Sequence, residues 1–248
     1  MRLFGIYIFL FSLFSSCDTA SSARFQIFID PTWASLGENF QANSIKAFSI
    51  ELTEEIAKIE NLTIVIYDKN GNNLLPSLQK KSCEGILTKM EPHLFYEKQY
   101  DFSDVYLLTG PVLVIPVATK ASSSFTGKEI AILDAEQENL AAQKYPGALL
   151  RPYTSTAQAL TDLSLGELDA AIIDVSTAEA FCRDLFQGVL KVELPPLTQE
   201  GLRVVTLHQE NPELISAFNR GLKTVKENGT YAKLAKKWSV SLNPRNGG

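Results

Sequence analysis

The sequence is poor in the residue types that most metal and redox chemistry requires. Its 248 residues include three cysteines, two histidines and two methionines. The two histidines, His93 and His208, stand far apart, and no cysteine and histidine spacing typical of a zinc site occurs. No motif that positions a catalytic nucleophile is present either. We therefore expect no metal centre and no nucleophilic enzyme, and the sequence implies no cofactor.

An excess of positive charge is also absent. The chain has 23 lysine and arginine residues against 28 aspartate and glutamate residues, which gives a formal net charge of −5 at pH 7. Both signs are scattered along the chain, so there is no basic stripe for nucleic acid and no basic patch for an anionic membrane surface. We expect a monomer that binds no nucleic acid.

Long apolar runs are lacking except at the start of the chain. Met1-Arg2 precedes an almost wholly apolar stretch, Leu3–Phe14. This stretch is too short for a membrane-spanning helix, which needs roughly 20 apolar residues. A short apolar run between a positive residue and small residues is typical of a signal peptide, which we place at residues 1–16.

The residue after that segment is a cysteine preceded by two serines. This arrangement resembles the lipobox of bacterial lipoproteins, with Phe14 where leucine is usual. We expect Cys17 to carry a lipid and residues 17–24 to tether the folded part to a membrane. The alternative is a plain signal peptide followed by a chance cysteine.

The two remaining cysteines leave two interpretations. In an exported protein, Cys83 and Cys182 either form a disulfide or pack as small buried hydrophobes. We favour buried thiols, since spacing alone does not establish a bridge.

Short runs of β-branched and aliphatic residues alternate with helical periodicity. The runs are Phe25–Asp30, Leu62–Tyr67, Leu113–Val117, Glu129–Leu133 and Ala170–Asp174. Between the first two runs, one helical face over residues 45–61 carries Phe48, Leu52, Ile56 and Ile59. Apolar residues make up 45% of the chain, enough for one large core or two medium ones. The alternation predicts an α/β fold with mainly parallel sheets and helices on both faces.

Two stretches rich in turn-forming residues, Asp104–Pro111 and Leu194–Gly201, are candidate crossings between two lobes. A chain with two crossings starts in one lobe, builds the second and returns to the first. We therefore expect lobe 1 to comprise residues 25–108 and 201–243, and lobe 2 to comprise residues 109–200. A ligand cleft in such a fold lies at the carboxyl ends of the strands.

The order of several short motifs resembles that of a known family. Asp101-Phe-Ser-Asp-Val-Tyr106 is similar to the D-F-S-x-x-Y segment of the family 3 bacterial solute-binding proteins, which serve ABC importers of polar amino acids. Further segments similar to the family pattern follow in order: Asp30–Trp33, Ala47–Leu52, Leu75–Leu78, Thr156–Asp174 and Glu227–Trp238. The resemblance implies a type II periplasmic binding fold, in which two lobes joined by two hinge crossings close over a ligand.

The resemblance also implies a function. A member of this family is the substrate-binding component of an ABC importer, which captures an amino acid or a related amine-bearing solute between its lobes and delivers it to a membrane permease. We expect the protein in the periplasm or at the cell surface, held to the membrane by its lipid. Its expected partners are a small-molecule ligand and the permease subunits, and we expect no enzymatic activity.

By the same resemblance, three residues form the amine side of the ligand pocket. Trp33 corresponds to an aromatic residue that lies against the ligand side chain, where an indole face attracts a cation; the alternative is a core tryptophan. Asp30 and Asp174 correspond to acidic positions at the cleft, and Asp174 to the anchor of the ligand α-ammonium. The alternative for Asp174 is a cap for a helix that begins near Ser176.

The carboxylate side of the family pocket is absent. Family members have a T-x-x-R unit whose arginine clasps the ligand carboxylate, and counting back from Phe102 places Tyr96 at the arginine position. One neutral hydroxyl cannot replace a guanidinium fork. The preceding donor positions are Lys89 and Glu91, and the glycine–threonine turn of the second lobe is replaced by Ala135-Glu136-Gln137.

We therefore hypothesise that the ligand is not held as an ordinary α-amino acid. Either its carboxylate meets Lys89 or Arg203, or the ligand is an amine with little need for an anion site. Glu91 and Glu136 would repel a carboxylate unless those cations neutralise them. The alternative is that Lys89, Glu91 and Tyr96 form a rearranged solvated surface.

Two other functions stay open. The fold also resembles that of secreted dehydratases and of an accessory domain of lytic transglycosylases, and an acid/base enzyme would have only Glu91 and His93 as a local pair. The missing carboxylate clamp motivates the other alternative, a surface lipoprotein or receptor module with a degenerate pocket and no transport role.

Overall fold

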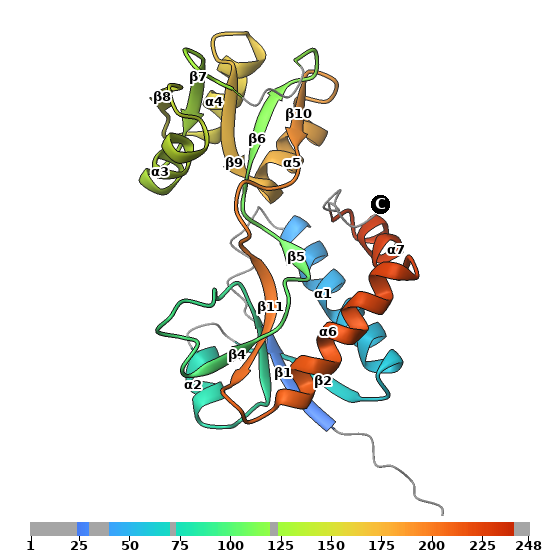
Figure 1. Ribbon diagram of the computed structural model, residues 1–248. Helices are drawn as coiled ribbons and strands as arrows, with labels where there is room; N and C mark the ends of the chain where they lie inside the picture. The colour runs from blue at the N-terminus through green and yellow to red at the C-terminus, as the bar shows by residue number, and fades with distance from the viewer. Residues whose placement is uncertain (1–23, 30–39, 70–72, 120–123, 241–248) are drawn as a thin grey trace, which may run out of the picture.

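The computed structural model describes residues 24–29, 40–69, 73–119 and 124–240. The predictions made for Cys17, Asp30 and Trp33 concern residues outside these ranges. The described chain forms two α/β lobes, one above the other in Figure 1, joined by a narrow neck. Within this part of the chain, no helix is long and apolar enough to cross a membrane.

Lobe 1, the lower one in Figure 1, is built on a sheet with the strand order β2-β1-β3-β11-β4, and β5 also pairs with β11. Its strands are β1 (Arg24–Ile29), β2 (Thr63–Asp68), β3 (Gly85–Thr88), β4 (Tyr100–Phe102), β5 (Leu107–Leu108) and β11 (Gly201–Leu207). Its helices are α1 (Phe40–Ile59), α2 (Leu74–Gln79), α6 (Pro212–Glu227) and α7 (Thr230–Lys237). The two faces of the sheet pack into separate apolar clusters, one with α1, α6 and α7 and the other with α2.

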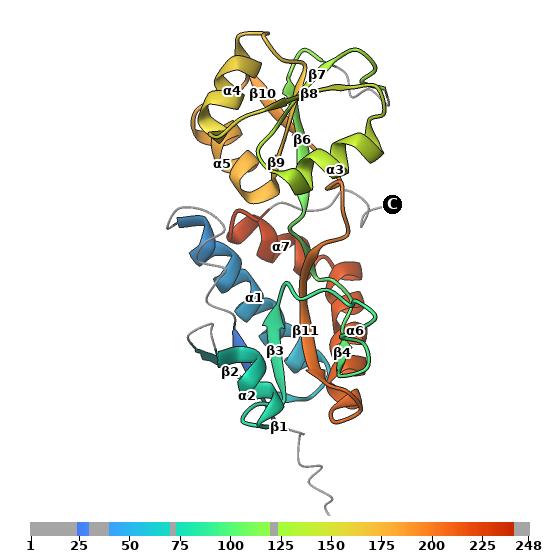
Figure 2. The ribbon, with the colours of Figure 1, turned by 90° about the vertical axis from the view of Figure 1, so that its left-hand side faces the viewer.

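Lobe 2 is built on a sheet with the strand order β10-β6-β9-β7-β8. Its strands are β6 (Pro111–Pro116), β7 (Glu129–Ile132), β8 (Leu149–Pro152), β9 (Ala170–Asp174) and β10 (Leu190–Glu193). Its helices are α3 (Ala135–Lys144), α4 (Thr156–Ser164) and α5 (Val175–Asp184). Helices α4 and α5 pack on one face and α3 on the other. Helices α2 and α3 lie on the side of the molecule that faces the viewer in Figure 2.

The two-lobe α/β fold with helices on both faces is as predicted, but the sheets are mixed rather than mainly parallel. The pairs β1–β2, β1–β3, β7–β8 and β7–β9 are parallel. The pairs made by β11 and by β6 are antiparallel. The difference arises because β6 and β11 enter their lobes from the neck and run away from it, whereas β3 and β9 end near it.

The predicted helical periodicity explains how α1 packs. Phe48, Leu52 and Ile56 are each 0% exposed and join β1 in the core of lobe 1. Ile59, which we predicted on the same face, is 41% exposed because it is the last residue of the helix.

Further along, Gly229 has a φ of 79° between α6 and α7, a left-handed conformation that glycine adopts without strain.

The neck consists of two chain segments that pass close to each other. Gly201, at the start of β11, pairs with Leu108 in β5. A methyl group on Gly201 would overlap the carbonyl oxygen of Leu107 and a methyl group of Val105, so only glycine allows this approach. The lobe boundaries between residues 108 and 109 and between residues 200 and 201 stay a proposal.

The two described cysteines lie in different lobes as free thiols. Cys83 is buried in the α2 cluster of lobe 1, and Cys182, in α5, is half-buried and packs against the core of lobe 2. Burial raises the pKa of each thiol to about 11, so both are protonated and unreactive at neutral pH. The structure thus agrees with free thiols rather than a disulfide, and Cys83 is buried as predicted whereas Cys182 is half-buried.

Candidate ligand-binding cleft

A pocket lies where the two lobes meet the neck. Its walls come from all three parts of the molecule: Ile45, Lys89, Ser239 and Val240 in lobe 1, Leu107, Leu108 and Thr109 at the neck, and Asp174, Val175, Ser176 and Glu179 in lobe 2. Lys89 follows β3, and Asp174 ends β9. Ligand sites of α/β folds form at such carboxyl ends of strands. The pocket therefore contains two of the residues predicted from the sequence, one from each lobe.

Asp174 occupies the N-cap position of α5, but its side chain makes no capping hydrogen bond. Asp174 therefore takes the predicted cap position but does not cap the helix through its side chain, which leaves the carboxylate available to a cation in the pocket. Desolvation by the surrounding protein raises the pKa of Asp174; the positive charge of Lys89 opposes this rise, and Asp134 and Glu136 add to it. These influences show that charged groups of both lobes lie near one another here.

The first turn of α3 holds the other two predicted residues of lobe 2. Gln137 is 7% exposed; its N–H donates to Asp134 Oδ1 at 2.8 Å, and its own Oε1 accepts from the Leu133 N–H at 2.9 Å. Gln137 therefore holds the start of α3 in place, and a direct ligand contact from it stays a prediction. Glu136, between Asp134 and Gln137, is exposed and adds negative charge beside Asp174.

In lobe 1, Lys89 and Glu91 follow β3 and are half-buried. Lys89 lines the pocket and lowers the pKa of Asp174 across the cleft. Glu91 raises the pKa of Glu200, which stands at the neck just before β11. The same segment of lobe 1 therefore carries opposite charges, with Lys89 acting on Asp174 and Glu91 acting on Glu200.

Tyr96 lies in a different environment. Its ring packs against the α2 cluster of lobe 1, with ring centroids 5.6 Å from Phe95 and 6.2 Å from Tyr100. It does not line the pocket described above. Tyr96 thus has a packing role in lobe 1, and a ligand contact from it stays a prediction.

Arg203 is a buried cation close to the neck. It is 8% exposed and lies in β11, directly opposite Thr88 in β3. Its Nε–H is buried and has no hydrogen-bond acceptor in the described part of the chain. Burial lowers the pKa of the guanidinium group, and the carboxylates of Glu91 and Asp104 oppose that shift. A buried donor without an acceptor is costly, so a ligand oxygen that reached it would gain a strong bond.

Carboxylates outnumber cations around the cleft. The acidic groups that influence one another are Glu91, Asp134, Glu136, Asp174 and Glu200. Desolvation raises the pKa of Glu200, and the nearby acidic groups raise it further. The cations among them are Lys89 and Arg203. A cleft with this balance attracts a cationic solute and disfavours a simple anion.

Sequence reasoning missed several of these residues. Glu200 lies in the predicted crossing, and Asp134 directly follows a predicted strand. Both positions are ones that the sequence places near the cleft, so the two residues could have been proposed. Nothing local marks Ser239 and Val240, whose place in the cleft depends on how α7 packs. Asp30 and Trp33 lie outside the described residues, and their ligand contacts stay predictions.

The acid/base pair considered from the sequence has little support. His93 is exposed, and its backbone N–H donates to the carbonyl of Glu91. His208 pairs with Asp101, Nδ1 to Oδ1 at 2.7 Å, at the end of β11 remote from the neck. In the residues that the structure covers, no group of three metal-ligating side chains occurs.

Comparison with known proteins agrees with this architecture. The chain is 28% identical over 205 residues to the arginine-binding extracellular protein ArtP of Bacillus subtilis, which covers 80% of this chain and 79% of that protein. It is 25% identical over 252 residues to the histidine-binding periplasmic protein of Salmonella typhimurium, with 96% and 97% covered. The unliganded open L-cystine solute receptor of Neisseria gonorrhoeae shares the fold, with a TM-score of 0.68 at 18% identity over 88% of this chain and 93% of that one.

A family model provides the broadest match. It describes bacterial extracellular solute-binding proteins, family 3, and matches residues 26–241, nearly the whole of the described chain. The match confirms the resemblance seen in the ordered motifs. From its matched residues and its two-lobe fold, the chain belongs to the bacterial extracellular solute-binding proteins of family 3.

Proposed function

We propose that this solute-binding protein captures a small solute with an ammonium or guanidinium group and delivers it to the permease of an ABC importer. The observation that carries the proposal is the convergence of carboxylates from both lobes on one cleft, with Asp174 in its pocket free of any capping bond. Relatives named as arginine-binding, histidine-binding and lysine/arginine/ornithine-binding support a basic solute.

Each charged group has a role in this proposal. Asp174 anchors the amine, because a charge-assisted bond in a partly desolvated cleft is among the stronger polar contacts. Glu136 and Glu200 add the negative potential that favours a second positive charge. Arg203, whose buried Nε–H has no acceptor among the described residues, receives the carboxylate of the solute, assisted by Lys89. A basic amino acid matches this pattern of two positive groups and one negative group.

The same charges give a mechanism for capture. Glu91 belongs to lobe 1, Glu136 to lobe 2 and Glu200 to the neck, so closing the empty cleft brings like charges together. A cationic solute between the lobes removes that repulsion and so favours the closed form through its differential affinity. The closed form is the one that the permease would recognise.

The test is calorimetric titration of the purified protein with arginine, ornithine, putrescine and glutamate. Arginine and ornithine should bind and raise the melting temperature, whereas glutamate should do neither. Asp174→Asn should weaken arginine binding by about tenfold or more, the loss of a charge-assisted bond. The matched control is Asp184→Asn at the exposed end of α5, which removes the same charge without touching the cleft. Preference for glutamate, or equal affinity in Asp174→Asn and the wild type, would contradict the proposal.

The membrane attachment is a separate proposal. Residues 1–16 direct export, Cys17 is acylated, and the protein acts as a monomer without enzymatic activity. Incorporation of radiolabelled palmitate in the producing bacterium tests the anchor. Label should appear in the wild type and disappear in Cys17→Ser, and equal labelling of both would contradict it.

A further inference from the structure

One half of the pocket is apolar. Five of its lining side chains are aliphatic: Ile45, Leu107, Leu108, Val175 and Val240. Ile45, Leu107 and Val175 are between 5% and 7% exposed and belong to the cores of the two lobes, so this wall is rigid. Asp174 lies next to Val175 in the same lining. The pocket therefore presents a carboxylate and an aliphatic surface side by side, as sites for amphipathic ligands do.

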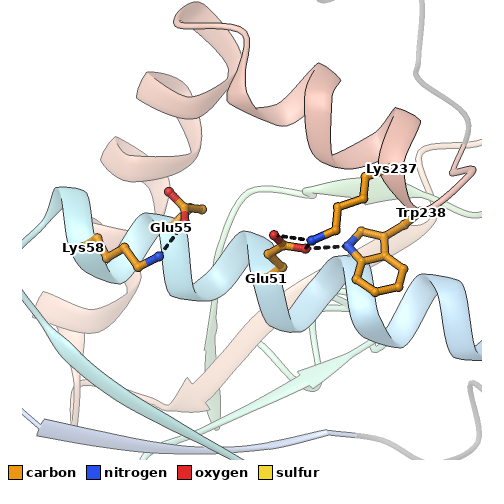
Figure 3. Close-up of polar contacts among 5 residues, drawn as sticks. All are labelled: Glu51, Glu55, Lys58, Lys237 and Trp238. Carbon is orange, nitrogen blue, oxygen red and sulfur yellow. Dashed lines mark hydrogen bonds and ion pairs between the residues drawn. The ribbon is translucent and has the colours of Figure 1, made fainter.

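The part of this wall that follows α7 is held in place from α1. Glu51 on α1 accepts hydrogen bonds from Lys237 Nζ at 2.7 and 2.8 Å and from Trp238 Nε1 at 2.7 Å (Figure 3). Ser239 then turns the chain with a φ of 52°, and the Val240 N–H donates back to the last turn of α7 at 2.9 Å. These bonds fix Ser239 and Val240 as a wall of the cleft.

We propose that the apolar half of the pocket is a second subsite, which takes the aliphatic chain of an amine whose cationic head is bound by Asp174. The inference rests on the proposed function, because it uses the same anchor. Charge complementarity decides the orientation: the head pairs with the Asp174 carboxylate, and the chain covers the aliphatic wall. An anionic chain such as a fatty acid is disfavoured, since the pocket is lined by two carboxylates, Asp174 and Glu179, against one cation, Lys89.

The chemical class of the solute follows from this arrangement. It is a primary amine with an unbranched aliphatic portion that contacts the aliphatic lining while the ammonium group pairs with Asp174. Burial of each methylene against such a wall contributes to affinity in proportion to the apolar area removed from water. The affinity for simple amines should therefore depend on chain length, which a site made only of charged groups would not produce.

The experiment titrates the full protein with n-alkylammonium chlorides from ethyl to hexyl. The dissociation constant should fall by up to about fourfold for each added methylene until the subsite is full. Val240→Phe fills the subsite and should flatten this dependence, and Val240→Ala, which removes part of the wall, should make it shallower. The matched control is Val189→Phe, at a valine 47% exposed before β10 and outside the pocket, and it should keep the wild-type dependence.

Two results would overturn the subsite: a dissociation constant independent of chain length in the wild type, or an unchanged dependence in both Val240 variants. The dependence on chain length is expressed as the ratio of the affinities for hexylammonium and ethylammonium. This ratio is unaffected if part of a variant protein is not correctly folded. Suppose that arginine binds, that Asp174→Asn weakens this binding by about tenfold or more, and that hexylammonium and ethylammonium bind the wild type equally. Then only the subsite fails. If Asp174→Asn changes neither arginine nor alkylammonium binding, the proposed function fails.

Discussion

Arg203 in β11 and Thr88 in β3 are direct partners across the antiparallel pair that leads from lobe 1 into the neck. Cross-strand partners point to the same face of a sheet. The guanidinium group therefore lies on the α2 face, near Glu91 in the segment that follows β3. The family resemblance places a carboxylate-binding arginine in that segment, at the position of Tyr96. In the proposed function, the cation that meets the carboxylate is instead Arg203, from a neighbouring strand.

Replacing Arg203 should remove selectivity for a carboxylate. Arg203→Met should weaken arginine binding by about tenfold to a hundredfold, the value of a hydrogen bond to a charged group, and leave agmatine, which lacks the carboxylate, almost unaffected. Calorimetric titration of both ligands measures the ratio. Arg220→Met on α6, which removes an exposed arginine paired with Glu60, is the control and should keep the wild-type ratio. Equal losses for arginine and agmatine would show that Arg203 only stabilises the fold.

The sequence predicted the elements whose signal is local. Strands β1, β2, β6, β7 and β9 were recognised because each is a short run of β-branched or aliphatic residues, and α1 because its apolar residues recur at helical spacing. The antiparallel character of the sheets was not recognised. It depends on the direction in which β6 and β11 leave the neck, which is a property of the whole topology and not of any one strand.

The site was predictable to a lesser degree, for a physical reason. Lys89 and Asp174 were predicted because their places in the ordered motifs correspond to ligand-binding positions of the family, and both line the pocket. Tyr96 was aligned with a ligand-binding position, but its aromatic ring packs against Tyr100 and the α2 cluster, which the alignment did not indicate. Val240 could not be found, because only the packing of α7 on α1 brings it to the pocket.

The ionised carboxylate of Asp174 should lower the stability of the protein at neutral pH, although amine binding requires it. Its pKa is raised above the ordinary value of 3.8, so the folded protein binds a proton there more readily than the unfolded chain does. The charged carboxylate therefore costs stability at neutral pH, and that cost disappears as the pH falls through the raised pKa. Asp174→Asn should then melt at a higher temperature than the wild type at pH 7 while binding amines about tenfold or more weakly.

The same shift predicts how binding depends on pH. An amine needs the ionised carboxylate, so wild-type affinity should begin to fall at a pH above 3.8 as protons compete with the ligand. Thermal melts and titrations at a series of pH values measure both effects. A variant Asp174→Asn that is less stable than the wild type at neutral pH would contradict the account, as would binding that is constant down to the ordinary pKa.

Glu51 should stabilise lobe 1 by holding the end of α7. Glu51→Ala removes the bonds from Lys237 and Trp238, and we expect a loss of about 1 kcal/mol in the free energy of unfolding, a charge-assisted value reduced for partial exposure. Glu55→Ala, one turn further along α1, is the matched control, because Glu55 pairs only with the exposed Lys58 among the residues drawn in Figure 3. Denaturant unfolding compares the two variants. Equal losses in the free energy of unfolding would contradict the idea that Glu51 holds the end of α7.

The hydrogen bond from Lys237 lowers the pKa of Glu51 from its ordinary value of 4.5. The stabilisation by Glu51 should therefore be fully present above that value and be lost as the pH falls through the lowered pKa. The difference in stability between the wild type and Glu51→Ala should accordingly vanish in acid. A difference that persists at a pH where carboxylates are fully protonated would show that packing, and not charge, holds α7.

Gly201 should be critical for the geometry of the neck. An alanine methyl at this position would overlap the Leu107 carbonyl oxygen and Val105, so the two crossing segments would have to separate. We expect Gly201→Ala to lower stability by about 1–3 kcal/mol, the usual cost of overpacking, and to weaken ligand binding because the lobes no longer meet in register. Gly166→Ala is the control: Gly166 has a φ of 80° but no atom close to an added methyl, so it suffers backbone strain without crowding. It should lower the melting temperature and leave the dissociation constant unchanged. If Gly201→Ala also lowers the melting temperature without changing the dissociation constant, the two crossing segments can separate without altering the cleft, and the neck does not set the geometry of the cleft.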